Sequence, residues 1–290
     1  MHYLAIVSII WALSFGLIGH ALSEIDPVFA ATVRLGIACL IFVPFLRWSK
    51  IPYPCHFKLV GYGAVQFGIM YVCYMIAFQI VPGQSHLVAL FSILTPLYVV
   101  LINDLRKREF SPKYLYAALL AIVGAATIKA RAGSMDSLWI AFGLMQLSGL
   151  AFGFGQVYYR GWKREHTEIK DLHIFALLYA GGFGVAIIAC AIFTNWERTQ
   201  LDANQVQVLL YLGIVASGLG FFLWNKGAVL CRAGTLAAFN NAVVPLAMAC
   251  SLFIFSERSE LEGDALIRLI LGSTFIIAAV ALSEKNANHG

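Results

Sequence analysis

One basic side chain lies where the sequence provides no opposite charge. Arg34 falls about six residues inside an apolar stretch at 28–47, roughly 9–10 Å from its end at 1.5 Å per helical residue. All 15 Asp and Glu residues lie between apolar stretches or at their ends. Because a guanidinium in hydrocarbon costs at least ~2.5–3.5 kcal/mol, Arg34 is expected to face a hydrated cavity, where its planar fork could bind a carboxylate. The alternative is that Arg34 reaches outward to water or binds loop carbonyls.

A pair of adjacent amides lies deep in another apolar stretch. Asn240-Asn241 comes shortly before Pro245, which lacks an N–H and loosens the helical turn before it. Each amide brings two N–H donors and a carbonyl acceptor into hydrocarbon, and all of them must find partners. This favours a ligand with both donor and acceptor atoms, such as an amide or a urea. Hydrogen bonding between helices is the alternative for any single amide.

Other polar and aromatic side chains inside apolar stretches extend this set. With Arg34 and the Asn pair, the candidate substrate-binding residues are Trp11, Ser14, Gln66, Tyr71, Gln146, Trp224 and Asn225. A bundle that only packed together would not need so many polar groups, so the set predicts a cavity. No HExxH, GxSxG, DDxxD or GxGxxG pattern is present, and the six cysteines are spaced singly. No catalytic residue, metal ion or cofactor is therefore predicted.

The composition identifies the class of protein that carries these residues. Of 290 residues, 60% are hydrophobic and 12% charged, with a mean hydropathy of +0.80, whereas soluble domains have roughly 45–50% and about 25%. Ten apolar stretches, each long enough to cross about 30 Å of hydrocarbon, lie at 3–22, 28–47, 59–80, 84–103, 114–130, 138–159, 173–194, 206–226, 235–255 and 266–282. We predict an all-α polytopic membrane protein whose partners are the lipid bilayer and a small-molecule substrate. A soluble enzyme, a nucleic-acid-binding protein and a disulfide-rich secreted domain are excluded.

The distribution of basic residues predicts the orientation. Of the 20 Lys and Arg residues, 14 fall on the side of the N-terminus, five fall on the other side, and Arg34 lies inside a stretch. Cytoplasmic loops are enriched in Lys and Arg. Both termini are therefore expected in the cytoplasm.

The two halves of the chain resemble each other. Ser14-Phe15-Gly16 is similar to Ala151-Phe152-Gly153, and Pro96 corresponds to Pro245. Because each half has five stretches, an odd number, the second half must insert upside down relative to the first, as in many secondary transporters. The predicted domains are a five-helix repeat at 1–130, an inverted five-helix repeat at 138–284, and a short cytoplasmic tail at 285–290.

These features together resemble one transporter family. The whole chain is similar to the EamA branch of the drug/metabolite transporter superfamily in Trp11–Phe15, Phe29–Arg34, Pro96, Pro245, Gly124 and Gly272. The resemblance implies a helical bundle around a central cavity, with the first four helices of each half lining it and the fifth bracing the outside. Members of the superfamily transport amino acids, sugars, nucleotide sugars and drugs, and many bacterial members are exporters.

A closer resemblance is to the single-component biotin uptake permeases of enteric bacteria. It rests on Val65–Tyr71, Leu94–Tyr98, Gln146–Ser148, Val215–Gly218, Trp224-Asn225, Ala233–Leu236 and Asn240-Asn241. It implies a secondary transporter of the bacterial inner membrane that imports biotin by alternating access, without an obligate protein partner. The carboxylate of biotin would then bind Arg34. The ureido group would bind Asn240, Asn241, Gln66 or Asn225, and the apolar ring would pack on Trp11, Tyr71 and Trp224.

Two alternatives to this function remain at the level of the sequence. The first is an exporter of amino acids or related metabolites built on the same cavity. The second belongs to a different class and is an intramembrane enzyme or a structural membrane protein.

Overall fold

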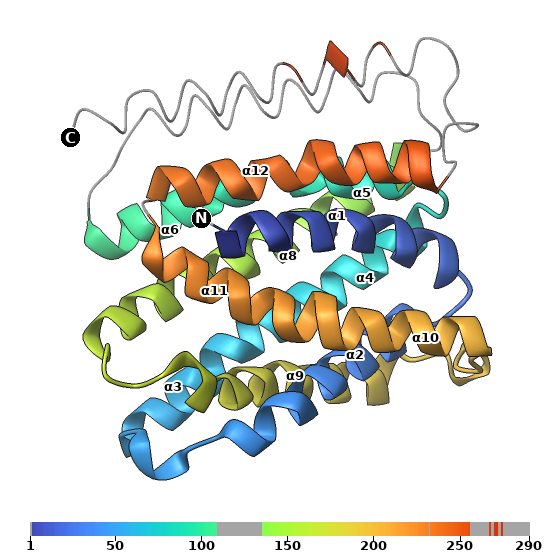
Figure 1. The fold of residues 1–290 in the computed structure, drawn as a ribbon. Coiled ribbons are helices and arrows are strands. Elements are labelled where there is room, and N and C mark those ends of the chain that lie inside the picture. The colour runs from blue at the N-terminus through green and yellow to red at the C-terminus, as the bar shows by residue number, and fades with distance from the viewer. Residues whose placement is uncertain are drawn as a thin grey trace.

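The computed structural model describes residues 2–108, 135–231 and 233–255, with the isolated residues 267, 270, 271 and 274. Regular structure in these ranges is helical, and they contain no β-strand (Figure 1). Seven helical stretches in them are long and apolar enough to cross a membrane: His2–Ala21, Pro27–Phe45, Tyr53–Ile80, Ser85–Arg106, Ser137–Glu165, Phe175–Phe193 and Ala203–Leu230. A shorter apolar helix covers Ala242–Ile254. The prediction of an all-α, multi-pass membrane protein is confirmed.

The observed helices differ from the predicted spans mainly at their ends. The third span begins at Tyr53 rather than 59, the sixth continues to Glu165 rather than 159, and the eighth covers Ala203–Leu230 rather than 206–226. The end turns have low hydropathy because they carry exposed side chains such as Lys58 and Arg164, whose charged heads reach the membrane surface. The spans predicted at 114–130 and 266–282 lie outside the described residues, apart from four positions of the second.

The helical elements of the described residues are of three kinds. The α-helices are α1 His2–Ala21, α2 Pro27–Phe42, α3 Tyr53–Gly63, α4 Met70–Ile80, α5 Ser85–Phe91, α6 Thr95–Lys107, α8 Met135–Glu165, α9 Phe175–Phe193, α10 Ala203–Tyr211, α11 Gly220–Leu230 and α12 Ala233–Ala249. The π-helical segments are η3 Ala64–Ile69, η7 Leu212–Leu219 and η8 Cys250–Ile254. Short 3-10 turns lie at Val43–Phe45, Trp48–Lys50, Ser92–Leu94, Asp171–His173 and Trp196–Arg198.

The helices lie side by side along one common direction (Figure 1). α1, α3, α9 and α12 begin at one end of the bundle, and α2, α6, α8 and α11 end there. We call this end the N-terminal end, and the other, at which α1 ends, the opposite end. Consecutive spans are therefore antiparallel, as their short connections require.

The third and eighth spans are both interrupted by a π-helical segment near the middle of the span. η3 and η7 each contain a glycine near the segment's end, Gly68 and Gly218. A π-helix disturbs the regular backbone hydrogen bonds, so its carbonyls can accept from side chains, and such segments are frequent at functional sites. In η7, the Trp11 indole N–H donates to the carbonyl of Ala216 at 2.9 Å, and the Tyr179 hydroxyl lies 2.7 Å from the carbonyl of Ser217. The π segment is thus held by side chains from other helices.

The opposite end of the bundle is joined by a buried carboxylate. Asp26 precedes α2, and its Oδ1 accepts from the backbone N–H groups of Val28 and Phe29 at 3.0 and 2.8 Å. The same carboxylate accepts from the Thr194 hydroxyl at 3.3 Å and from the Asn195 N–H at 3.0 Å, just beyond α9. Asp26 therefore both caps α2 and fastens the start of α2 to the end of α9.

We expect Asp26→Ala to lower the free energy of unfolding by about 2 kcal/mol, because it removes a helix cap and leaves buried donors without an acceptor. Asp202→Ala is the matched control, since Asp202 caps α10 with a capping box on the exposed surface. For Asp202→Ala the free energy of unfolding should fall by about 1 kcal/mol. The measurement is the thermal unfolding midpoint of both purified variants in detergent. Equal shifts would contradict a joining role for Asp26.

Candidate functional site

A cavity lies between the helices, with an empty volume of about 710 Å³ that includes its open part. The lining comes from α1, α2, α4, α6, α8, α11 and α12 and from the turn before α6. The lining residues are Trp11, Ser14, Phe15, Arg34, Met70, Tyr71, Tyr74, Ser92, Thr95, Met145, Ser148, Gly149, Phe152, Phe221, Asn240 and Val243. The wall is mainly apolar, with one cation.

Arg34 is that cation, and only 2% of its side chain is exposed. Its Nε donates to the Ser217 hydroxyl at 3.3 Å and its Nη2 to the Tyr71 hydroxyl at 3.1 Å. Its Nη1 lies 3.5 Å from the sulfur of Met75, a weak acceptor. The Arg34 Cζ also lies 4.7 Å from the centroid of the Tyr71 ring, a cation–π contact. No carboxylate of the described residues contacts Arg34, so the charge is held by neutral groups and is suited to an anion in the cavity.

The hydroxyls beside Arg34 form a connected group. The Tyr71 and Ser217 oxygens are 2.8 Å apart, so the two hydroxyls bond each other as well as the guanidinium. Ser217 lies in η7, whose backbone is held in turn by Tyr179. The position of Arg34 therefore depends on α4 and on a π segment of the other half of the chain.

A cluster of aromatic rings closes one side of the cavity. The Trp11 ring lies 4.8 Å from Phe221, 5.8 Å from Phe152 and 4.7 Å from Trp224, measured between centroids. Trp11, Phe152 and Phe221 line the cavity, whereas Trp224 lies behind them and is 0% exposed. These rings offer an apolar face on which a ring-shaped ligand could pack.

The cavity brings together five of the ten predicted site residues: Trp11, Ser14, Arg34, Tyr71 and Asn240. Ser14 donates to Ile10 O at 2.8 Å and Asn240 donates to Leu236 O at 3.1 Å, each within its own helix. The side chain of Asn241 lies outside the described residues. Asn240 keeps an amide at the cavity wall, as the sequence predicts.

The structure places the other four predicted site residues away from the cavity wall. Gln66 and Asn225 bond each other at 3.1 Å, and Trp224 lies behind Trp11. Gln146 joins α8 to its neighbours: its Nε2 donates to Phe91 O at 3.0 Å and its Oε1 accepts from the Tyr98 hydroxyl at 3.0 Å. In Gln146 every polar atom already has a partner, so it acts as a structural brace.

Sequence reasoning missed several polar groups of the cavity wall. Ser92 begins the short 3-10 turn Ser92–Leu94, and Thr95 follows this turn directly before Pro96. The proline was the available signal for an irregular backbone at this place. Tyr74 follows Tyr71 by three residues, which puts both on one face of α4.

Known proteins match this chain over most of its length. The EamA-like transporter family matches residues 1–130 and 180–283, more than half of the sequence. The chain belongs to the EamA-like transporter family. As a member of this family, it is a multi-pass transporter of the bacterial inner membrane rather than an enzyme, and its substrate is a small molecule.

Individual relatives of the transporter are similar from end to end. It is 36% identical over 282 residues to a probable biotin transporter of Pseudomonas aeruginosa, covering 97% of this chain and 96% of that protein. It is 36% identical over 291 residues to the biotin transporter of Escherichia coli K12 and 35% identical over 289 residues to that of Salmonella typhimurium, covering 98% of this chain and 93% of each relative. A crystal structure at 16% identity has a TM-score of 0.68 over 98% of this chain and 96% of the other, which supports the fold alone.

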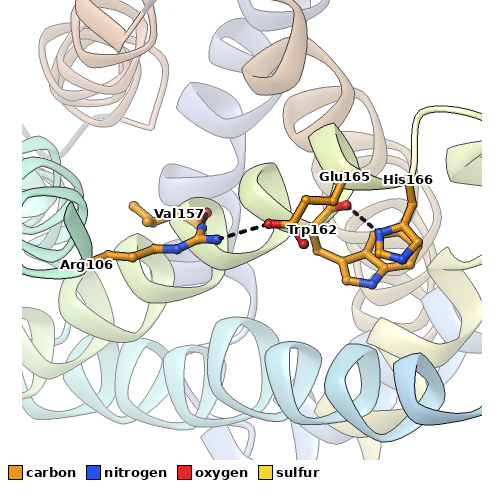
Figure 2. Close-up of polar contacts among 5 residues, drawn as sticks. All are labelled: Arg106, Val157, Trp162, Glu165 and His166. Carbon is orange, nitrogen blue, oxygen red and sulfur yellow. Dashed lines mark hydrogen bonds and ion pairs between the residues drawn. The ribbon is translucent and has the colours of Figure 1, made fainter.

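At the N-terminal end of the transporter, α6 and α8 are joined by one arginine (Figure 2). Arg106 donates through Nη1 to Val157 O at 3.3 Å, and its Nη2 lies 3.7 Å from Glu165 Oε1. Gly161 makes room for the guanidinium, because a side chain there would overlap it. The side chains of Arg106 and Glu165 are 37% and 66% exposed, so their ion pair contributes little to stability. This contact between the two halves can separate at small cost.

Proposed function

We propose that this protein is a secondary transporter that imports biotin across the inner membrane by alternating access. The observation that carries the proposal is Arg34, a buried cation at the wall of the cavity whose contacts with described residues are all with neutral groups. It occurs in a chain that is 35–36% identical to biotin transporters over nearly its full length. Biotin has a carboxylate for the cation, a fused ring system for the aromatic wall, and a ureido group for polar side chains.

The ligand would lie across the cavity with its two ends in different surroundings. Its carboxylate would bind the Arg34 guanidinium, which Tyr71 and Ser217 hold in position through the bonds described above. Its ring would pack on Trp11, and its polar end would meet hydroxyls and amides of the wall. Ser14 and Asn240 are the predicted site residues available for that end, and Asn241 follows directly in the chain.

Alternating access requires two halves that move against each other, and an inverted repeat would supply them. The proposed halves are 1–130 and 138–284. In support of this division, the family matches two separate ranges, 1–130 and 180–283, and η3 and η7 interrupt equivalent spans of the two halves. The loops at the N-terminal end carry basic residues such as Arg47, Lys50 and Lys170, which favours a cytoplasmic location for this end.

Export of amino acids, the alternative function, has less support in the cavity. An amino acid carries an ammonium group beside its carboxylate, and a buried ammonium needs a carboxylate or several acceptors close by. The lining residues that the structure describes include Arg34 but no Asp or Glu. The cavity therefore suits a ligand with one negative charge and no positive one.

The test is uptake of labelled biotin by biotin-auxotrophic cells at nanomolar supply, with and without this protein. We expect uptake well above that of the empty vector, and inhibition by unlabelled biotin. Detection of the protein in the membrane fraction is the control for expression. Uptake at the level of the empty vector, with the protein present in the membrane, would refute biotin import and leave metabolite export to be tested with toxic amino-acid analogues.

A further inference from the structure

A second group of polar side chains lies behind the aromatic cluster, away from the cavity. Gln66 in η3, Gln156 in α8, and Trp224 and Asn225 in α11 are all between 0 and 1% exposed. Gln66 Nε2 donates to Asn225 Oδ1 at 3.1 Å. The remaining polar atoms have no hydrogen-bond partner in the part of the chain that the structure describes: Gln66 Oε1, both amide atoms of Gln156, Trp224 Nε1 and Asn225 Nδ2. We call these four side chains the amide cluster.

The amide cluster lies next to the rings that close the cavity. Gln156 follows Phe152 by four residues, so it lies one helical turn further along the same face of α8. Trp224 contacts Trp11 and Phe152 directly, with centroids 4.7 and 6.5 Å apart. α8 and α11 both end at the N-terminal end of the bundle (Figure 1). Asn225 follows Phe221 by four residues, just as Gln156 follows Phe152, so each amide lies one helical turn closer to that end than the ring before it. The amide cluster thus lies on the side of Phe152 and Phe221 that faces the N-terminal end.

The three helical elements that carry these side chains meet closely at this place. A side chain at Gly155 would overlap the side chain of Gln66, so α8 approaches η3 without any atoms between them. η3 is a π-helical segment, and such segments are frequent at functional sites. The amide cluster is therefore enclosed in this conformation and borders a π-helical segment.

The polar atoms of the amide cluster that lack a partner have the chemistry needed to bind an amide or a urea. Two carbonyl oxygens, of Gln66 and Gln156, can accept from ligand N–H groups. Three nitrogen atoms, of Gln156, Trp224 and Asn225, can donate hydrogen bonds to a ligand carbonyl. Buried polar atoms without partners destabilise a protein, and an apolar side chain of the same size would be more stable in their place. A bundle that only had to pack would not need Gln156.

We propose that the amide cluster is a second binding station for the urea end of the substrate, which becomes accessible when the Trp11 and Phe152 rings move apart. This inference rests on the proposed function. Arg34, the eighth of the 16 residues of α2, bonds Tyr71, which follows Gln66 by five residues toward the opposite end, so Arg34 lies on the opposite-end side of the amide cluster. The substrate therefore moves with its urea end leading, and the amide cluster stabilises it on the way to the cytoplasm. Gln156 is a specificity residue of this step and takes no part in the first binding step in the cavity.

The test compares Gln156→Leu with Gln146→Leu, two substitutions of a buried amide on the same helix. Three quantities are measured for each variant: the thermal unfolding midpoint, the Kd for biotin of the purified protein, and the maximal rate of biotin uptake in cells at equal expression. For Gln156→Leu we expect an unfolding midpoint equal to or above that of the parent and an unchanged Kd. The maximal rate should fall about tenfold, equivalent to about 1.4 kcal/mol in the barrier. Gln146→Leu should lower the unfolding midpoint, because its amide has partners in the folded protein.

Each of the remaining outcomes would contradict one specific statement. An unchanged maximal rate for Gln156→Leu, with biotin uptake by the parent, would refute the second station and leave the proposed function in place. A weakened Kd would place Gln156 in the first binding step, and a lowered unfolding midpoint would make it a structural residue; both refute the proposal. No biotin uptake by the parent would refute the proposed function, and the second station would fall with it.

Discussion

Gly63→Ala should prevent the bundle from folding stably, whereas Gly61→Ala, two residues earlier on the same helix, should leave stability unchanged or slightly higher. A Cβ at Gly63 would lie less than 3 Å from the backbone carbonyl of Leu178 in α9. A Cβ at Gly61 would have nothing within 4 Å, and alanine has the higher helix propensity. The two substitutions therefore differ only in what the new methyl group meets.

The loss of stability expected for Gly63→Ala is large because the new Cβ would overlap backbone atoms of the neighbouring helix. Gly181 in α9 faces the Val60 carbonyl of α3 in the same way, so the two helices are in direct contact through a pair of glycines, a common packing mode in membranes. No side chain can rotate away, and α3 would have to separate from α9. Overpacking commonly costs about 1–3 kcal/mol and sometimes more, and we expect about 3 kcal/mol or more here.

The measurement is the size-exclusion profile and unfolding midpoint of both variants in detergent. Gly63→Ala should give aggregated protein or a strongly lowered midpoint, and Gly61→Ala a single peak like the parent. Because η3 begins at the residue after Gly63, any folded fraction of Gly63→Ala should also transport poorly. A monodisperse Gly63→Ala protein with the midpoint of the parent would show that α3 and α9 are not held in this contact.

The sequence predicts the helices well and their irregularities poorly. The apolar stretches identify each described span because hydropathy averaged over about 19 residues detects membrane helices. Polar end turns, such as the one that contains Tyr53 and Lys58, are missed by the same average. The π segments η3 and η7 are missed for another reason: a π segment changes the hydrogen-bond pattern of a few residues, and neither composition nor spacing records that change.

Prediction of the site depends on knowing which face of a helix each polar residue occupies. Arg34 could be predicted because a charge inside a span must have a polar environment. In the sequence, Gln66 and Asn225 cannot be distinguished from Asn240, because all three are amides inside apolar stretches. In the structure, Gln66 and Asn225 bond each other behind the rings, although they are far apart in the chain. Gln156 lies one turn beyond Phe152, and this spacing was the available signal for it. Which amides bind each other and which face the cavity is decided by tertiary packing.

Arg34→Gln should abolish the ability of the transporter to distinguish biotin from its neutral amide. In the parent, the guanidinium can bind a carboxylate through two parallel bonds, and an uncharged amide loses the charge-assisted part of that interaction. Removing one partner of a buried charge pair costs about 2–5 kcal/mol, which corresponds to a loss of about 30-fold or more at about 1.4 kcal/mol per tenfold. We therefore expect biotin uptake to fall by about 100-fold, with much less change for the amide.

The measurement is the uptake efficiency of labelled biotin and labelled biotin amide by the parent and by Arg34→Gln, at equal expression. Uptake of the amide by the variant shows that the protein is folded and that the cavity is intact. Arg34→Lys should give an intermediate preference for biotin, since a lysine keeps the charge but lacks the planar fork. An equal loss for both ligands in Arg34→Gln would make Arg34 a structural residue.

A second variant separates the charge of Arg34 from its position. Ser217→Ala removes the hydroxyl that accepts from Arg34 Nε and pairs with the Tyr71 hydroxyl. It leaves the positive charge in the cavity wall, so the preference for biotin over the amide should persist, while the uptake of biotin becomes less efficient because the guanidinium is less well oriented. The difference between Arg34→Gln and Ser217→Ala therefore assigns recognition of the anion to the positive charge of Arg34. It assigns the efficiency of uptake to the Ser217 hydroxyl, which η7 holds beside the guanidinium.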